Sequence, residues 1–196
     1  MKKLDMNHIE SLEVKSDNFC FSKINYFPSP NNDERPDDVE PRLIVIHGIS
    51  LPPGEYGNNH IKSFFLNRLD SNKHSYFKKI KYLRVSPHLL IDRDGQLSQF
   101  VPFNRRAWHA GASHYQGIDN CNDYSIGIEL EGVDDNEYTE LQYQILAKVI
   151  QSLMRFYPII SSRKVVAHSD IAPFRKTDPG KAFDWFKLYE YIDTTT

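Results

Sequence analysis

The sequence has few cysteines, no excess of charge of either sign and no long apolar run. Cys20 and Cys121 are the two cysteines among 196 residues, which excludes a disulfide framework, and neither lies in a Cys-x-x-Cys metal-binding spacing. We therefore expect two reduced thiols in a reducing compartment. The net charge is −2, so the composition gives no electrostatic basis for binding nucleic acid or an anionic membrane.

Targeting and membrane-spanning segments are also absent from the pattern. The first ten residues, MKKLDMNHIE, carry two lysines but no apolar stretch behind them, which argues against a secretory signal peptide. No apolar run approaches the length of a membrane span. We expect a cytoplasmic protein with no membrane, nucleic-acid or obligate protein partner. Its 196 residues suffice for one sizeable core but not for two comfortable domains.

Apolar periodicity predicts an α/β fold, a single domain with a mixed central β-sheet of about five strands flanked by helices. Strands are expected at residues 42–48, 86–92, 96–101, 124–132 and 164–168, and the Asp94-Gly95 turn predicts that the second and third form a hairpin. Helices are expected at 60–69, 139–156 and 180–192. Residues 1 to about 40 lack strong periodicity and are expected to form an extended arm on the domain.

The two longer expected helices have identifiable signals. Thr139 and Gln142 form a capping box at the start of the first. Its inward stripe is predicted to contain Leu141, Ile145, Leu146, Val149, Ile150, Leu153 and Phe156. The closing helix is predicted to turn inward Phe183, Phe186, Leu188, Tyr189 and Ile192.

Two histidines stand where apolar strands open onto loops. His47 follows the run Leu-Ile-Val-Ile, and His168 follows Val-Val-Ala; Asp178 comes ten residues later in a proline-punctuated loop. Two imidazoles and one carboxylate leave a tetrahedral zinc ion one open position, as in a catalytic site. The alternatives are buried histidines with satisfied hydrogen bonds, and an Asp178 that caps a helix with Pro179 at its first position.

The strand at 124–132 places Glu129 and Glu131 on one face, together with the small residues Ser125 and Gly127. The small residues suggest space left for a ligand; the alternative is a solvent-exposed face. Either glutamate can serve as a general base, and Lys176 can stabilise a developing oxyanion. With a zinc-bound water, these groups supply what amide hydrolysis needs.

Six segments in order then carry a family resemblance: LIVIH (43–47), ISLPPGEYG (49–57), RVSPH (84–88), RAWHAG (106–111), NDYSIGIELEG (122–132) and HSDIAPFRKTDPG (168–180). The sequence resembles the zinc-dependent N-acetylmuramoyl-L-alanine amidases, a family that includes phage amidases and peptidoglycan recognition proteins, and within it the cytoplasmic branch. The resemblance runs from about Pro28 to Trp185. It implies hydrolysis of the amide between the lactyl group of 1,6-anhydro-N-acetylmuramic acid and L-alanine of muropeptides.

The resemblance also implies residue roles. One Zn²⁺ per chain would be held by His47, His168 and Asp178, with Glu129 rather than Glu131 as the catalytic glutamate and Lys176 as the transition-state lysine. The implied substrate-binding residues are Arg84, His88, Arg106, Trp108 and His109. Arginine suits the carboxylates of an anhydromuropeptide because it binds them in a bidentate manner. The alternative for each arginine is an ordinary surface charge.

The sequence departs from the family pattern in two places. Gly48 stands where relatives often carry asparagine, and residues 1–25 form an N-terminal extension to a predicted amidase domain at 26–196. Two other functions are compatible with this fold class. A non-catalytic muropeptide-binding module is disfavoured because all three ligands are present, and an amidase acting on intact cell wall is disfavoured because no signal peptide is evident.

Overall fold

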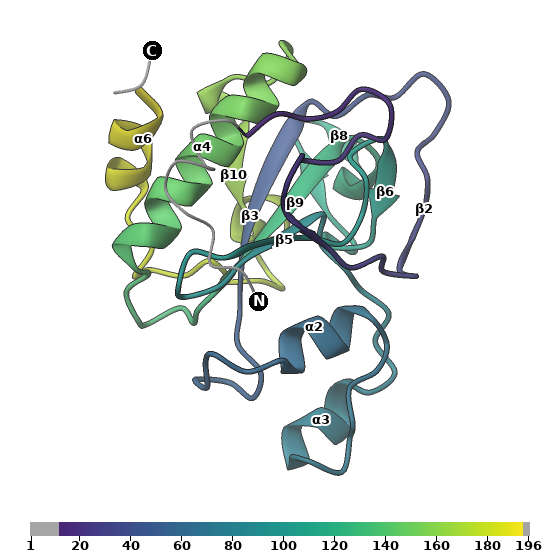
Figure 1. Ribbon diagram of the computed structural model, residues 1–196, viewed down its shortest axis with the longest axis vertical. Coiled ribbons are helices and arrows are strands. Elements are labelled where there is room, and N and C mark those ends of the chain that lie inside the picture. Colours follow the sequence, from purple (N-terminus) through teal and green to yellow (C-terminus); the bar gives the residue numbers. More distant parts are fainter. Residues whose placement is uncertain (1–11, 194–196) are drawn as a thin grey trace.

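The computed structural model describes residues 12–193, so the first ten residues, which we do not expect to be a signal peptide, lie outside the described residues. A six-stranded sheet in the order β1-β5-β4-β9-β3-β10 forms the centre of the fold (Figure 1). The β4–β5 pair is antiparallel and every other neighbouring pair is parallel. The predicted mixed α/β sheet is therefore confirmed. Its strands are β1 (Asn25–Tyr26), β3 (Leu43–Ile49), β4 (Leu89–Ile91), β5 (Leu97–Gln99), β9 (Ser125–Glu131) and β10 (Val165–Ala167).

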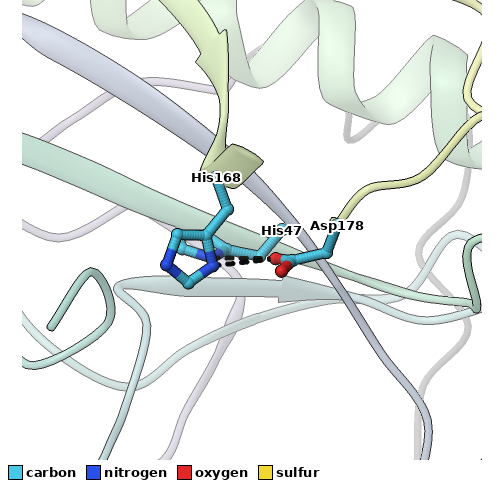
Figure 2. Close-up of side chains that lie close together, drawn as sticks. All are labelled: His47, His168 and Asp178. Carbon is cyan, nitrogen blue, oxygen red and sulfur yellow. Dashed lines mark hydrogen bonds and ion pairs between the residues drawn. The ribbon is translucent and has the colours of Figure 1, made fainter. Parts of the chain in front are cut away.

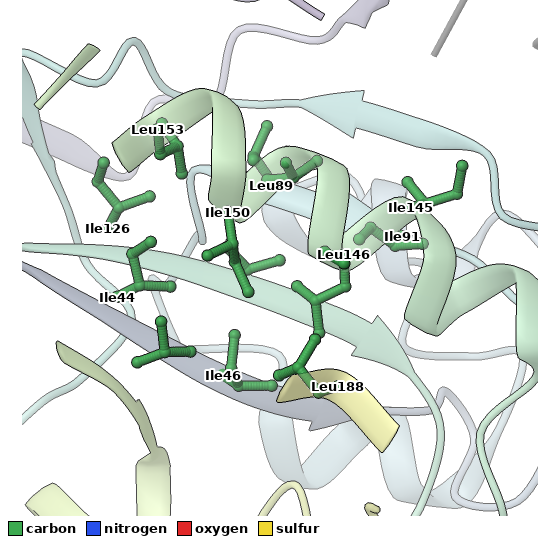
Figure 3. Close-up of a cluster of buried hydrophobic side chains, with 14 of the residues drawn as sticks. Ile44, Ile46, Leu89, Ile91, Ile126, Ile145, Leu146, Ile150, Leu153 and Leu188 are labelled. Carbon is green, nitrogen blue, oxygen red and sulfur yellow. The ribbon is translucent and has the colours of Figure 1, made fainter. Parts of the chain in front are cut away.

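One face of the sheet carries the main hydrophobic core. Because side chains alternate along a strand, Ile44 and Ile46 of β3 point to the same face, toward helix α4 (Glu140–Phe156). Figure 3 shows Leu146 and Ile150 of α4 packed over them. Helix α6 (Trp185–Asp193) closes this layer from outside (Figure 1). Fully burying an aliphatic side chain of this kind contributes about 1.5–3 kcal/mol, so this layer supplies much of the stability.

The opposite face has a looser cover made of short elements. Helices α2 (His60–Phe65) and α3 (Ser75–Ile80) form a lobe beside the sheet and enclose a second apolar cluster. Nearer the ends of β3 and β9 lie β6 (Arg105–Ala107), β7 (His114–Tyr115), β8 (Ile118–Asp119), the 3₁₀ turn η1 (Cys121–Asp123) and α5 (His168–Ile171). Strand β2 (Asn32–Glu34) pairs with β6, and the 3₁₀ turn η2 (Ser162–Lys164) precedes β10. Between these two groups of elements lies a cleft lined in part by polar side chains.

Several expected boundaries were wrong. Helix α2 ends at Phe65 rather than at residue 69, α3 was not expected, and α6 begins at Trp185 rather than 180. A β-carbon at Gly180 would lie 2.1 Å from Cα of Asp134, and its φ of +87° is left-handed. A left-handed φ is incompatible with an α-helix, so residue 180 belongs to a turn before α6. Only glycine adopts this conformation, and fits this close to Asp134, at low cost.

Two side chains expected inside the core lie outside. Phe186 is 72% exposed and Leu141 is 42% exposed. Helix α6 buries only Leu188 and Ile192, four residues apart, because it touches the rest of the fold along one narrow stripe. The capping box of Thr139 and Gln142 at the start of α4 is confirmed.

The described part of the N-terminal segment, residues 12–25, packs on the domain. Leu12 and Phe21 are buried in the main core, and the Phe21 ring meets Phe103 edge-on at 5.2 Å. The backbone N–H of Phe21 donates to Oε1 of Gln99 at 2.9 Å. The expected arm-like packing is thus seen in these residues, and the boundary at residue 25 stays a prediction. No helix within residues 12–193 is long and apolar enough to cross a membrane.

Candidate active site

His47, His168 and Asp178 converge at one edge of the sheet. Strands β3 and β10 are parallel with Ile46 opposite Ala167, so the next residues, His47 within β3 and His168 at the start of α5, lie side by side. Their Nδ1 atoms lie 2.8 Å apart. Oδ2 of Asp178 lies 2.9 Å from Nδ1 of His168 and 3.4 Å from Nδ1 of His47 (Figure 2). In the described part of the chain this trio is the group whose donor atoms could hold a metal ion.

The second ring nitrogens of both histidines have partners of their own. Nε2 of His168 lies 3.3 Å from the carbonyl oxygen of Ala110, and Nε2 of His47 lies 2.9 Å from Nδ1 of His109. Nε2 of His109 continues to Oγ of Ser125 at 3.2 Å. A proton on each Nε2 leaves each Nδ1 lone pair free to coordinate a cation, which is the usual arrangement around a ligating histidine.

The space expected for a ligand over Gly127 is filled by the protein itself. A β-carbon at Gly127 would lie 2.4 Å from Cγ of His109, so the glycine makes room for that imidazole. His109 is therefore brought against His47 as a supporting group. The signal was present in the sequence, but the partner of Gly127 is 18 positions away and its packing is decided by the tertiary fold.

The protonation states suit a cation site. Burial lowers the pKa of His47 to about 4, and the nearby His168 adds to this effect. Burial alone would raise the pKa of Asp178, but its hydrogen bonds with His168 and His47 outweigh burial and lower the pKa below the usual range. A neutral imidazole and an ionised carboxylate are the forms that bind a metal. Two nitrogens and one oxygen form a donor set that fits Zn²⁺ with a position open.

Glu129 lies beside this trio because β9 is paired with β3 in a register that sets Glu129 opposite His47. Its Oε2 is shielded from solvent and has no hydrogen-bond partner among residues 12–193. Burial raises the pKa of Glu129 well above the ordinary value, the Asp178 charge raises it further, and Lys176 opposes the shift. A carboxyl group with a raised pKa next to a reacting centre can exchange protons near neutral pH.

Glu131, the other glutamate of the strand, has a different environment. Its Oε1 accepts a hydrogen bond from the backbone N–H of Gly57 at 2.8 Å, and its Oε2 accepts one from that of Arg93 at 3.1 Å. The carboxylate thereby joins the 50–58 loop to the β4–β5 turn. Both oxygens are occupied, so the structure separates two residues that the pattern treats alike.

A cleft of about 470 Å³ opens beside the trio, and His168 and Asp178 are among its lining residues. Its polar end includes Glu129, His109, His168, Lys176 and Asp178. Its far wall comes from the α2–α3 lobe and is apolar, with Leu51, Phe64, Phe65, Tyr76, Ile80, Leu83 and Val85. The sequence pattern did not predict this wall, because helical spacing of apolar residues at 60–69 indicates a buried face without showing what lies against it.

The two predicted substrate-binding arginines differ in their availability. Arg84 is exposed between two residues that line the cleft, and within residues 12–193 its guanidinium donates to the carbonyl oxygens of Lys81 and Leu83. Arg106 is held by Asp33 and by Asp123, each at 2.6 Å, and lies outside the cleft lining. Hydrogen bonds with the two aspartates raise its pKa. Arg106 thus has structural partners already, whereas Arg84 can reach a ligand.

His88 and Trp108 also lie outside the cleft lining. His88 is fully buried; its Nδ1 accepts from the backbone N–H of Gly127 at 3.0 Å, and its Nε2 lies 3.0 Å from the carbonyl oxygen of Arg105. Trp108 is partly exposed, and its backbone carbonyl accepts from Ser86 N–H at 3.0 Å. Both residues connect segments around the site. Of the five predicted substrate-binding residues, only His109 is part of the cleft lining, and Arg84 is exposed at its edge.

A histidine–histidine–aspartate trio next to a buried glutamate and a lysine is an arrangement suited to a hydrolase, and comparison with known proteins shows the class to which the chain belongs. The family profile described as N-acetylmuramoyl-L-alanine amidase matches residues 37–181. The chain belongs to this family and is an amidase of that type.

Relatives and solved structures support the assignment over most of the chain. The 1,6-anhydro-N-acetylmuramyl-L-alanine amidase AmpD of Escherichia coli K12 is 53% identical over 169 residues, covering 86% of this chain and 92% of that protein. A crystal structure of a selenomethionine AmpD derivative matches with a TM-score of 0.87 and 51% identity, covering 90% of this chain and 98% of its own. The E. coli amidase AmiD, solved with the substrate anhydro-N-acetylmuramic acid-L-Ala-D-γ-Glu-L-Lys, matches with a TM-score of 0.56 and 30% identity, covering 81% of this chain and 60% of its own.

The buried histidines predict how stability without metal depends on pH. Folding lowers the His47 pKa to about 4, whereas an unfolded histidine titrates near 6.5. Between these values the unfolded chain binds more protons, so the free energy of unfolding falls as the pH drops from about 6.5 toward 4. His47 alone contributes about 2 kcal/mol of this fall between pH 7 and 4.5, and the buried His88 and His109 act in the same direction.

Urea titrations of chelator-treated protein at several pH values measure this slope. His47→Gln should flatten it, because the glutamine side chain does not titrate. Identical slopes for the wild type and His47→Gln would contradict the assignment.

Proposed function

We propose that this amidase is zinc-dependent and hydrolyses the amide between the lactyl group of 1,6-anhydro-N-acetylmuramic acid and L-alanine of muropeptides. The observation that carries the proposal is the convergence of His47, His168 and Asp178 within a few ångströms of each other, next to Glu129 and at the end of one cleft. This arrangement occurs in a chain that shares half its residues with AmpD proteins.

His47, His168 and Asp178 would hold the zinc ion through Nδ1, Nδ1 and a carboxylate oxygen. Zinc with three protein ligands lowers the pKa of its bound water to about 7 and polarises a carbonyl oxygen. The chain prepares this site in advance, because His109 and the Ala110 carbonyl fix the orientation of both imidazoles. The low pKa of Asp178 keeps a negative charge available to the ion.

Glu129 takes the proton from the attacking water and later gives it to the leaving amine. Its raised pKa favours both transfers near neutral pH. Lys176 lies at the same end of the cleft and stabilises the negative charge that develops on the carbonyl oxygen.

The anhydromuropeptide substrate is supported by the names of the relatives and by the AmiD complex. The apolar wall from Leu51 to Val85 offers a surface for the sugar or the alanine methyl group, and Arg84 at its edge can pair with a carboxylate of the peptide. We propose the cytoplasm as the compartment, because the motifs resemble the cytoplasmic branch and Cys20 and Cys121 are free thiols. Cell fractionation checks this location.

Metal content tests the ligand assignment directly. The purified protein should contain about one zinc ion per chain, and His168→Ala should lose most of it, since two remaining ligands hold zinc poorly. The exposed histidine variant His114→Ala should retain its zinc. Elemental analysis of the three proteins gives the answer, and full zinc retention in His168→Ala would remove the assignment.

Turnover tests the glutamate assignment. Glu129→Gln should keep zinc and lose about 10²-fold or more in kcat, because the amide cannot act as the base. Lys176→Ala should lose a comparable factor, as when an oxyanion donor is removed. Glu131→Gln is the matched control on the same strand and should keep most of kcat. An active Glu129→Gln together with an inactive Glu131→Gln would show that the wrong glutamate was chosen.

Paired substrates test specificity. The anhydro bridge locks the sugar into one ring form, and a cleft shaped to it should disfavour the ordinary reducing sugar. We expect kcat/KM for anhydromuramyl peptide to exceed that for the muramyl peptide at least about 10-fold, with little release of dye from intact sacculi. Equal values for the pair, or rapid digestion of sacculi, would favour a general cell-wall amidase.

A further inference from the structure

Tyr138 connects the turn before α4 to the loop that carries Asp178. Its side chain is 5% exposed, and its hydroxyl donates to the carbonyl oxygen of Pro179 at 2.9 Å. Pro179 directly follows Asp178. One hydrogen bond from the core therefore reaches the residue after a proposed metal ligand.

Two glycines make room for this tyrosine. A β-carbon at Gly48, the residue after His47, would lie 2.4 Å from the Tyr138 hydroxyl oxygen, and one at Gly132 would lie 2.3 Å from ring atom Cε1. Gly48 is in β3, and Gly132 follows β9 and donates its N–H to the Ile49 carbonyl at 2.9 Å. The Tyr138 ring thus lies between the ends of β3 and β9. Any side chain larger than glycine at position 48 or 132 would occupy the space that the ring needs.

The same turn holds the ligand loop at a second point. The backbone N–H of Ala182 donates to the carbonyl oxygen of Asp134 at 3.0 Å, and Gly180 packs directly against Asp134. Within the loop, the carbonyl oxygen of Asp178 accepts from the N–H of Ser169 at 3.1 Å. Asp178 is therefore placed by contacts on both sides, and Tyr138 supplies the side-chain hydrogen bond closest to it on the C-terminal side.

We propose that Tyr138 is a positioning residue for Asp178: its hydroxyl fixes the 178–179 segment so that Oδ2 of Asp178 points at both imidazoles. This inference rests on the proposed role of Asp178 as a metal ligand. Without the hydroxyl, the buried Pro179 carbonyl loses this hydrogen-bond partner, and a shift of the loop to find another would displace Asp178. Groups that orient a metal ligand in this way affect metal affinity although they never touch the ion.

Tyr138→Phe removes only the oxygen, and Tyr143→Phe is a matched control. Tyr143 is also buried, also packs against Phe183, and its hydroxyl also bonds to backbone, but at Asp184 N–H, six residues beyond Asp178. Zinc affinity would be measured by competition with a chromogenic chelator, using the metal alone. We expect the zinc Kd to rise about 10-fold in Tyr138→Phe and less than about 2-fold in Tyr143→Phe.

The outcomes separate the two proposals. If the wild type binds no zinc, the proposed function fails and this inference falls with it. If the wild type binds zinc and Tyr138→Phe binds it equally well, or if both tyrosine variants weaken binding alike, only the positioning role is overturned. If both tyrosine variants weaken zinc binding alike, the loss comes from general destabilisation.

Gly48→Ala supplies a second, independent measurement. In the wild-type background its methyl group collides with the Tyr138 hydroxyl, and zinc affinity should fall. In the Tyr138→Phe background that atom is gone, and the next neighbours of the methyl group are Cα of Pro179 at 3.5 Å and Cζ of residue 138 at 3.7 Å, which are ordinary contacts. The alanine should then change affinity less than about 2-fold relative to Tyr138→Phe alone, as expected of two changes that act through one atom. Equal losses in both backgrounds would contradict the proposal.

Discussion

The parallel pairing of β3 with β9 and with β10 is the constraint on which the site depends. Parallel strands end at the same edge of a sheet, and the register sets His47 opposite Glu129 and one residue beyond the Ile46–Ala167 pair. His47, Glu129 and His168, from three distant parts of the sequence, are therefore brought together by strand pairing and not by the conformation of a long loop. Only Asp178 and Lys176 come from a loop, and that loop is tied to the fold at both of its sides.

One face of the sheet forms the main hydrophobic core, and the other face carries the residues of the candidate site. The face under α4 is filled with aliphatic side chains and forms a dense core (Figure 3). The other face carries His47, Gly127 and Glu129, and is covered by short elements that leave a cleft. Buried polar groups are costly unless they have partners, and on this face the histidines have them in a chain from His47 through His109 to Ser125. On this same face, Oε2 of Glu129 is buried and has no hydrogen-bond partner in the described part of the chain.

Two glycines near the site each make room for a different large side chain. Gly127 admits the His109 ring from one face of the sheet, and Gly48 admits the Tyr138 hydroxyl from the other. Each removes a β-carbon so that a larger side chain can approach the backbone of a central strand. The large side chains that enter are the ones that orient His47 and hold the loop after Asp178. The glycines are thus part of the support of the site, although they contribute no chemical group to it.

The sequence by itself determined the α/β class, the central strands, the long capped helix and the candidate residues His47, His168 and Asp178. These follow from local patterns, because a polar residue after an apolar strand is visible without knowing what lies beside it. Tertiary structure decided which partners each residue has. It left Glu129 in the cleft and bound Glu131 to two backbone amides, paired Arg106 with Asp33 and Asp123, and filled the space over Gly127 with His109. Such contacts join segments tens of residues apart, and their choice depends on strand register and packing that no local pattern encodes.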